Sequence, residues 1–105
     1  MKKMYRQGDV LLVKVDDIPK KVKQQKSNVV VEGEATGHAH RLHNGQILIY
    51  KDEETYENKE TMFINAMKNA KLVHEEHGPI EIEVGFYMVI RQREYDEEKN
   101  RLVFD

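Results

Sequence analysis

The chain has 105 residues, with 17 lysines and arginines against 19 aspartates and glutamates and a formal net charge of −2. This length predicts a single domain that spans residues 1–105. The absence of cysteine excludes disulfides, thiolate zinc sites and cysteine nucleophiles. The nearly balanced charge argues against a protein that grips long nucleic acid, which needs a basic surface. A small phosphorylated ligand, which needs only a local basic patch, remains compatible with this composition.

The sequence contains no uninterrupted apolar stretch of about 18 residues, the length that a membrane-spanning helix needs. The two lysines near the amino terminus are not followed by an apolar segment, so they do not resemble a signal peptide. We therefore expect a cytoplasmic protein that does not contact membranes.

Segments rich in β-branched and aromatic residues recur along the chain and are separated by glycine, proline and charged turns. The predicted strands cover residues 9–15, 29–31, 46–50, 80–84, 86–95 and 101–104. Residues 60–70 are compatible with one short helix or with parts of two strands at 61–66 and 70–74. Many short strands with turns between them predict a mainly β fold, a small antiparallel barrel or sandwich with at most one short helix.

The dipeptide Asn44-Gly45 separates two β-like runs and predicts a tight hairpin turn, because a type I′ turn needs positive φ at both central residues. A two-residue loop would pair His43 with Gln46 and His40 with Ile49. Since side chains alternate between the faces of a strand, the two faces then follow by counting. The inward face would carry His38, His40, Leu42, Ile47 and Ile49, and the opposite face Arg41, His43 and Leu48.

Four of the five histidines form two closely spaced pairs. His38 and His40 are two residues apart on a predicted strand, so both project from the same inward face. His74 and His77 lie in a polar corner that ends in a Gly-Pro step. A single inward histidine is more often a hydrogen-bonded structural residue than a catalyst. Two such pairs, brought together by the fold, favour a functional site.

Such a cluster supports two kinds of chemistry. Without metal, one imidazole can accept a proton while another donates one, which suits cleavage of an RNA-type phosphodiester. Alternatively, the four histidines bind a divalent metal such as zinc, with Glu75, Glu76 or Glu81 completing the ligand set. The helical zinc signature HExxH is absent, and no glutamate follows His40 at the short spacing expected of a cupin.

A second group of residues is suited to holding phosphate. The candidate substrate-binding residues are Arg41, Arg91, Arg93 and Tyr95, followed by Arg6 and Gln7. Arg91, Arg93 and Tyr95 alternate along a predicted strand and so share one face. Guanidinium forks bind phosphate through two hydrogen bonds, and a tyrosine ring can stack on a base. The alternative is a solvated face on which these arginines make weak pairs with neighbouring acids.

Four motifs in the same order along the chain resemble a family of small bacterial and phage proteins. These motifs are Arg6–Val10 (RQGDV), residues 33–40 (GEATGHAH), His74–Ile80 (HEEHGPI) and Arg91–Tyr95 (RQREY). The family is similar to small ring nucleases associated with type III CRISPR antiviral defence and with mobile elements. Such enzymes open cyclic oligoadenylate second messengers without a metal and so switch the immune response off.

The resemblance implies a histidine-dependent, metal-independent phosphodiesterase that acts on cyclic oligoadenylate or a related short RNA-like ligand. His38, His40, His74 and His77 would be its catalytic residues. The symmetry of a cyclic ligand would favour a homodimer with the ring bound near the two-fold axis. Two alternatives remain open: a cupin-like metal-binding protein built on the same histidines, and a non-catalytic nucleotide-binding module that acts as a sponge or inhibitor.

Overall fold

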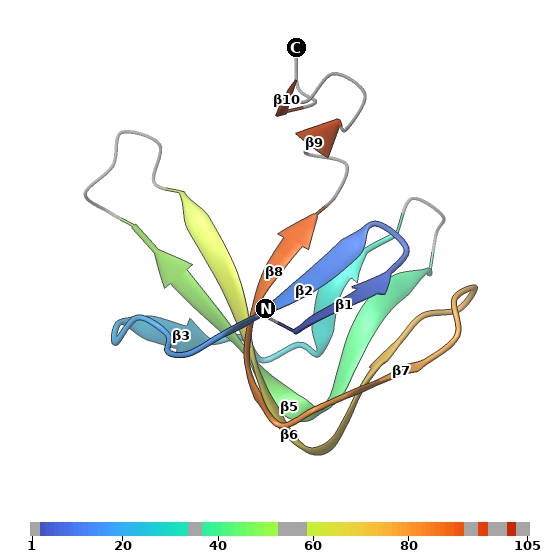
Figure 1. Ribbon diagram of the computed structural model, residues 1–105, viewed down its shortest axis with the longest axis horizontal. Coiled ribbons are helices and arrows are strands. Elements are labelled where there is room, and N and C mark those ends of the chain that lie inside the picture. The colour runs from blue at the N-terminus through green and yellow to red at the C-terminus, as the bar shows by residue number, and fades with distance from the viewer. Residues whose placement is uncertain (1–2, 34–36, 53–58, 92–94, 97–100, 103–105) are drawn as a thin grey trace.

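The computed structural model describes residues 3–33, 37–52 and 59–91, together with the backbone of residues 95–96 and 101–102. Every regular element in these residues is a β-strand, which confirms the predicted mainly β fold (Figure 1). No helix in the described part of the chain is long and apolar enough to cross a membrane. The strands are β1 (Met4–Gln7), β2 (Val10–Val15), β3 (Val22–Gln24), β4 (Val29–Glu32), β5 (Ala39–Lys51), β6 (Glu60–Val73), β7 (Ile80–Ile82), β8 (Gly85–Arg91), β9 (Tyr95–Asp96) and β10 (Arg101–Leu102).

Eight of these strands form one antiparallel sheet. Its hydrogen-bonded order is β1-β2-β8-β6-β5-β3, while β4 pairs with β5 and β7 pairs with β6. The sheet curls strongly, but its two end strands, β1 and β3, do not pair with each other, so it is not closed into a barrel. β9 and β10 form a separate two-stranded sheet.

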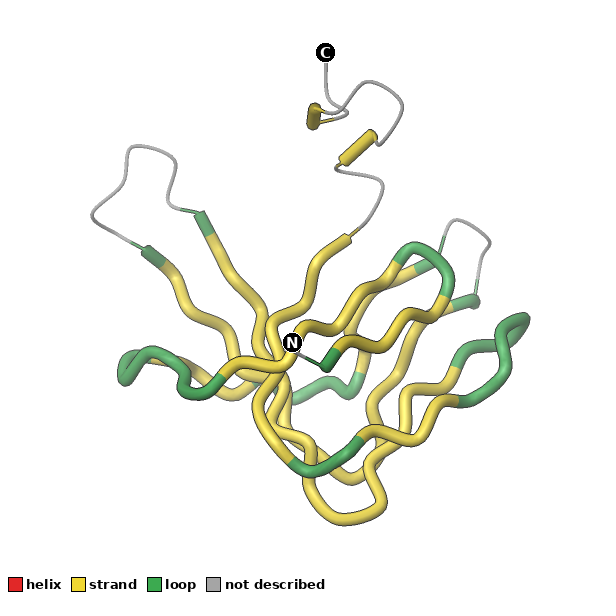
Figure 2. Tube along the Cα trace, in the orientation of Figure 1, coloured by secondary structure: helices red, strands yellow, loops and turns green. Residues whose placement is uncertain are grey.

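A long hairpin made of β5 and β6 lies at the centre of the sheet. Figure 2 shows that both strands bend sharply at the same level, which divides the hairpin into two arms. The register of the ladder shifts at this bend, between His43 and Gly45 of β5. One arm carries β4 and β7, and the other carries β3. The bend lets a single hairpin supply both halves of the curled sheet.

The predicted hairpin turn at Asn44-Gly45 is wrong, because β5 continues through both residues. Asn44 does have the positive φ that the turn required, 60°, but this conformation forms a bulge at the bend. Its side-chain amide donates to the carbonyl oxygen of Asn69, 3.0 Å away, and Asn69 also has positive φ, 64°. A Cβ at Gly45 would lie 2.8 Å from the carbonyl oxygen of Asn65, so only glycine fits at this position of the β5–β6 ladder.

The predicted pairing within residues 40–49 is wrong for the same reason. His43 pairs with Lys71 of β6, and Ile49 pairs with Met62. Beyond the paired strands, the backbone N–H of Asp52 still donates to the carbonyl oxygen of Lys59, 3.0 Å away, so the hairpin extends at least to these two residues. Alternation along each half of β5 still directs Leu42 and Ile47 into the core and leaves His43 exposed, as predicted.

Several other expectations are corrected by the strand boundaries. Residues 60–70 are not helical but belong to β6, which also contains most of the two shorter strands expected at 61–66 and 70–74. The strand expected at 86–95 is described as far as Arg91, and residues 92–94 lie outside the described residues. β1 and β3 were not among the predicted strands. Both are short and rich in polar residues, so they carry little hydrophobic periodicity.

The core is built from side chains of six strands. Its buried members are Val10, Leu12, Val30, Leu42, Ile47, Ile64, Ala66, Ala70, Leu72, Ile82 and Tyr87. The ring of Tyr5 packs edge-on against Tyr87, with 5.8 Å between centroids, and its hydroxyl accepts the backbone N–H of Glu83 at 3.1 Å. These contacts hold β1 against the segment between β7 and β8. They bring the end of β1 close to the connection between β6 and β7, where the polar site lies.

Candidate active site

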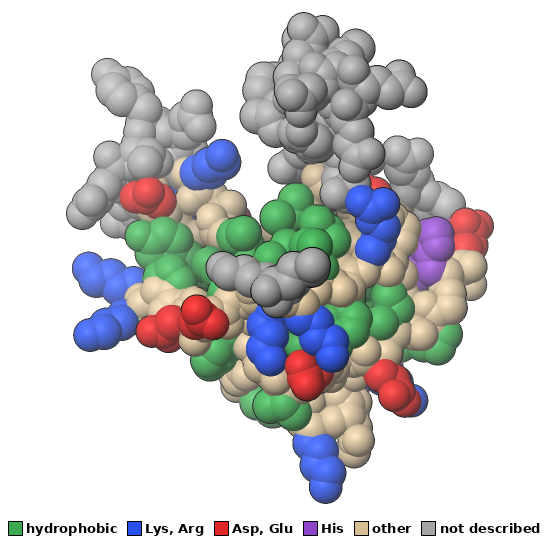
Figure 3. Space-filling model, in the orientation of Figure 1, with side chains coloured by type: hydrophobic (Ala, Val, Ile, Leu, Met, Phe, Trp, Pro, Cys, Tyr) green, Lys and Arg blue, Asp and Glu red, His purple; other side chains and the backbone are tan. Residues whose placement is uncertain are grey.

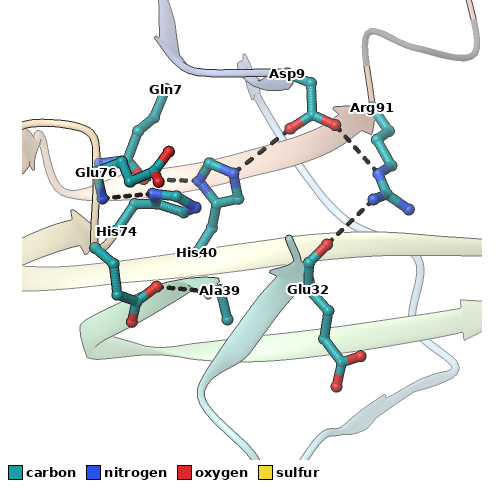
Figure 4. A network of polar contacts seen from close by, with 9 residues as sticks. Gln7, Asp9, Glu32, Ala39, His40, His74, Glu76 and Arg91 are labelled. Atoms are coloured by element: carbon teal, nitrogen blue, oxygen red, sulfur yellow. Dashed lines mark hydrogen bonds and ion pairs between the residues drawn. The ribbon is translucent and has the colours of Figure 1, made fainter. Parts of the chain in front are cut away.

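Four chain segments meet at one end of the sheet and form a polar cluster (Figure 4). They are the β1–β2 turn, the start of β5, the β6–β7 connection and the end of β8. The ring centroids lie 4.3 Å apart for His40 and His74, 4.7 Å for His74 and His77, and 5.8 Å for His38 and His74. The two predicted histidine pairs are therefore side by side, which we refer to below as the histidine cluster.

His40 lies at the buried centre of the histidine cluster, and the buried side chain of Gln7 contacts it. The Gln7 amide nitrogen donates to the carbonyl oxygens of Leu72 and Gly78, each 2.9 Å away. A flipped amide would direct its oxygen at these two carbonyls, so the orientation of the side chain is fixed. The Gln7 oxygen consequently faces Nδ1 of His40, 2.9 Å away.

This contact determines where the His40 ring carries its proton. An amide oxygen only accepts, so Nδ1 must donate, and the lone pair of the neutral ring lies on Nε2. Burial lowers the pKa of His40 below its ordinary value, and the neighbouring His74 acts in the same direction. Asp9, whose Oδ1 lies 3.5 Å from Nε2, opposes that shift. His40 is thus held neutral, with a carboxylate beside the nitrogen that would receive a proton.

Asp9 also connects the histidine cluster to Arg91. Its second carboxylate oxygen lies 3.4 Å from Nε of Arg91, and Nη2 of the same arginine donates to the carbonyl oxygen of Glu32 at 3.2 Å (Figure 4). A guanidinium has five N–H groups, and these contacts use two of them. The Arg91 side chain is 27% exposed, so it can meet a ligand at the rim of the cluster.

Gly8 allows the β1–β2 turn to approach the histidines. Its φ is +59°, a left-handed conformation that L side chains rarely adopt. A Cβ at this position would lie 2.7 Å from Nε2 of His77 and 3.3 Å from Cε1 of His40. Glycine is required here for both reasons, and the turn covers one side of the buried His40 ring.

Glu76 orients two of the histidines in opposite senses. Its backbone N–H donates to Nδ1 of His74 at 3.0 Å, so the proton of a neutral His74 lies on Nε2. Its carboxylate lies 3.6 Å from Nδ1 of His38, which favours a proton on that nitrogen and leaves the Nε2 lone pair of a neutral ring free. One ring therefore presents a donor and its neighbour an acceptor.

Glu75 ties the β6–β7 connection to the start of β5. Its carboxylate accepts the backbone N–H of Ala39 at 2.7 Å and the guanidinium of Arg41 at 2.5 Å. The Ala39 N–H, supported by Arg41, lowers the pKa of Glu75 to about 2. Glu75 is consequently ionised across the physiological range. Arg41, predicted as a phosphate ligand, is engaged with this carboxylate on the edge of the site.

Solvent reaches the four imidazoles to different degrees. The side chain of His40 is only 3% exposed, whereas that of His38 is 27% exposed. His74 is partly buried and His77 is exposed. A ligand at the surface would therefore meet His38, His74 and His77, while His40 lies beneath them.

Three of these residues could also hold a metal ion. His38, His74 and Glu75 each offer one ligand atom, and these atoms lie within 4.8 Å of one another. Nitrogen and carboxylate ligands of this kind suit zinc. However, His74 already accepts a hydrogen bond at Nδ1, and a neutral ring of that form has a proton on Nε2. A metal on either nitrogen would require His74 to give up this hydrogen bond or its proton, so the donor set fits a metal only after rearrangement.

The predicted phosphate-binding strand is described only in part. Arg91 lies at the edge of the histidine cluster, whereas Arg93 and the side chain of Tyr95 lie outside the described residues. Gln7 was predicted only as a weaker phosphate-binding candidate, but it is buried and contacts His40 instead. The role of Asp9 was not predicted from the sequence. The two polar residues that flank Gly8 could have indicated this role, because a tight turn between two strands presents both side chains to the neighbouring segment.

Comparison with known families gives one result. Residues 6–92 match the family described as Domain of unknown function (DUF8820). The chain belongs to the DUF8820 family. No curated protein and no solved structure matches it. The DUF8820 match begins at the residue before Gln7 and ends at the residue after Arg91, so it contains every side chain of the site that the structure describes.

Proposed function

We propose that this DUF8820 domain is a metal-independent phosphodiesterase whose histidine cluster cleaves cyclic oligoadenylate or a related short RNA-like ligand. The observation that carries the proposal is the opposite orientation of two adjacent, accessible imidazoles. Glu76 leaves a lone pair on Nε2 of His38 and a proton on Nε2 of His74. General acid–base catalysis needs such a pair, one group to take a proton and one to supply it.

The proposed reaction balances with these two groups alone. His38 Nε2 accepts the proton of a ribose 2′-hydroxyl, and the 2′-oxygen forms a bond to the adjacent phosphorus. The bond from phosphorus to the 5′-oxygen breaks, and the leaving oxygen takes the proton from His74 Nε2. The products are a 2′,3′-cyclic phosphate and a free 5′-hydroxyl. Arg91, on the rim, would stabilise the negative charge that builds on the phosphate oxygens.

His40 has a supporting role in this proposal. It is too buried to touch a ligand, but its ring lies 4.3 Å from that of His74. Gln7 fixes its proton on Nδ1, and burial and His74 favour its neutral form against the opposing effect of Asp9. The neutral form keeps positive charge out of the cluster. A neutral neighbour avoids the repulsion that a second imidazolium would impose when His74 or His38 becomes charged during the reaction.

The test is incubation of the purified protein with cyclic oligoadenylates of several ring sizes in excess EDTA, with chromatographic analysis of the products. We expect linear products that carry a 2′,3′-cyclic phosphate. Turnover should be lost in His38→Gln and His74→Gln. His43→Gln is the matched control, because His43 is exposed and outside the cluster. Unchanged ligands at every ring size, or turnover that depends on added metal, would contradict the proposal.

One observation favours a second candidate, the metal-binding site formed by His38, His74 and Glu75. It predicts stoichiometric zinc after purification without chelator, and a fall in thermal stability when EDTA removes the ion. Tight binding of cyclic oligoadenylate without any product would instead support a sponge. Size-exclusion chromatography with light scattering, with and without ligand, tests the homodimer that a symmetric ring would favour.

A further inference from the structure

The end of the β5–β6 ladder, beside the histidine cluster, holds an anionic side chain of the protein itself. Arg41 of β5 pairs with Val73, the last residue of β6, so the residue that continues this register opposite Ala39 is Glu75. Because the strand has ended there, the Glu75 side chain accepts the Ala39 N–H, at 2.7 Å. The same carboxylate accepts the guanidinium of Arg41. Two donors of β5 therefore hold an anion where the ladder stops.

The anion held by these donors lies close to the histidines. The Arg41 side chain projects from the face of β5 opposite to the histidine cluster, because neighbouring side chains alternate along a strand. The Ala39 N–H lies in the plane of the sheet, however, and the end of the ladder is open to both faces. A carboxylate oxygen of Glu75 accordingly lies within 4.8 Å of one ring nitrogen of His38 and one ring nitrogen of His74. An anion at this position is within reach of both imidazoles.

Solvent also reaches this position. The side chains of Arg41 and Glu75 are 36% and 35% exposed, and Glu75 belongs to the β6–β7 connection and not to a strand. Figure 3 shows a histidine side chain exposed next to an acidic one on the flank where the β6–β7 connection lies in Figure 1. A dissolved anion can therefore approach the two donors, and the carboxylate can leave them for water without the unfolding of a strand.

A carboxylate at this position resembles the group on which the proposed chemistry would act. A carboxylate and a phosphodiester each carry one negative charge shared by two terminal oxygens, and backbone N–H groups and guanidinium forks bind either of them. The Ala39 N–H, supported by Arg41, attracts an anion strongly enough to lower the pKa of Glu75 to about 2. Two such anions cannot share this pair of donors, because like charges at contact distance repel.

We propose that the Ala39 N–H and Arg41 form a phosphate-binding site that the Glu75 carboxylate itself occupies, and that a ligand phosphate fills the site by displacing this carboxylate. A phosphate on the same donors lies close to His38 and His74, the base and the acid of the proposed reaction. Its assignment as the scissile phosphate rests on the phosphodiesterase proposed above, whereas the anion site and its internal occupant do not. Glu75 is thus a built-in competitor that sets the ligand concentration at which the site fills.

The experiment is titration of the full-length ¹⁵N-labelled protein with inorganic phosphate at neutral pH and low ionic strength, followed at the Ala39 amide. We expect weak binding to the wild type and binding about tenfold or more tighter to Glu75→Ala, because the competing anion and its charge are removed. Addition of Arg41→Gln to Glu75→Ala should abolish most of this gain. In Glu75→Gln the amide oxygen can still accept the Ala39 N–H but carries no charge, so its affinity should lie between those of the wild type and Glu75→Ala.

Two comparisons make this result specific to the site. Glu81→Ala removes the same charge from an exposed position of β7 and should leave phosphate binding as it is in the wild type. Dimethyl phosphate, a diester with a single charge, should give the same order of affinities among the variants. The proposal is overturned if folded Glu75→Ala binds phosphate no more tightly than the wild type, if Glu81→Ala gains as much affinity, or if phosphate leaves the Ala39 amide unshifted.

Turnover of cyclic oligoadenylate separates this proposal from the phosphodiesterase. If the wild type cleaves the ligand, Glu75→Ala should have a lower KM. If no variant cleaves it but Glu75→Ala shows the expected gain in phosphate affinity at the Ala39 amide, the phosphodiesterase is refuted and the anion site stands. If the wild type cleaves it and Glu75→Ala shows no such gain, the phosphodiesterase stands and the anion site proposed here is refuted.

Discussion

Replacement of Gln7 by leucine tests the polar network around His40 most directly. Gln7 is only 2% exposed and makes three hydrogen bonds, to His40 and to the carbonyl oxygens of Leu72 and Gly78. Leucine has a similar volume and removes all three. A buried polar group left without a partner costs about 1–3 kcal/mol. Because Gly78 is exposed and water can replace its lost bond, two groups remain unsatisfied, and we expect the free energy of unfolding to fall by about 3 kcal/mol.

The same substitution should move a proton on the His40 ring. With no acceptor at Nδ1, the neutral ring is free to carry its proton on Nε2 and to donate it to Asp9, whose carboxylate oxygen lies 3.5 Å away. The ¹⁵N chemical shifts of the ring nitrogens distinguish the two neutral forms. We therefore expect the Nδ1–H form in the wild type and the Nε2–H form in Gln7→Leu.

Urea denaturation and ring ¹⁵N spectra of the wild type and Gln7→Leu provide the measurement. Gln24→Leu is the control, because Gln24 is exposed and its side chain makes one long contact, 3.3 Å, with Gln46. That control should change stability by less than about 0.5 kcal/mol. If Gln7→Leu loses no more stability than the control and His40 keeps its proton on Nδ1, the network around His40 does not hold the ring as described.

Three further predictions follow from single contacts. Gly8→Ala should destabilise the fold by more than Gly37→Ala. Both glycines have positive φ, but among the described residues only a Cβ at Gly8 would meet another atom, Nε2 of His77 at 2.7 Å. Equal thermal shifts for the two variants would contradict this. The free energy of unfolding should decline as pH falls through the ordinary histidine pKa of 6.5, because the unfolded chain takes up a proton more readily than folded His40 does. His40→Asn should flatten this decline, and parallel pH curves for the variant and the wild type would refute the assignment. Glu75→Gln should be less stable than the wild type above pH 4.5, and the difference should shrink as pH falls toward 2, because the lowered pKa of Glu75 stabilises the fold only while the carboxylate is ionised.

Several strands could be predicted because their composition leaves no alternative. Residues 10–15 and 86–90 are rich in β-branched and aromatic residues, and both segments are strands in the structure. Alternation correctly directed Leu42 into the core and His43 to the surface. Such local patterns depend only on the period of a strand, which every sheet shares.

The topology of the central hairpin could not be read from the same patterns. An asparagine with positive φ followed by glycine is typical of a tight turn, but it also suits a bulge. The choice depends on whether residues 46–50 fold back to pair with residues 39–43 or continue in the same strand and pair with another one. In this chain the next strand, β6, pairs with both halves of β5, so Asn44 bends the strand instead of ending it. The sequence around Asn44 does not indicate which of these two pairings is more stable.

The candidate site was predictable in its histidines but not in the groups that orient them. Two closely spaced pairs on inward or turn positions were sufficient to predict a cluster. The partner of His40, however, is 33 residues away in sequence, and the contact between Asp9 and Arg91 joins residues 82 apart. Such partners are defined only by the curl of the whole sheet, which no single spacing in the sequence encodes.

The position of β1 at the end of the sheet links the protonation of the site to local unfolding. β1 has only four residues, pairs with β2 alone, and ends at Gln7. Edge strands of this kind open more readily than the strands between them. Each opening of β1 withdraws the Gln7 amide, so His40 is released from its fixed tautomer while the rest of the sheet stays folded. The exchange rates of the β1 amides would therefore measure how often the histidine cluster loses the proton arrangement on which its chemistry depends.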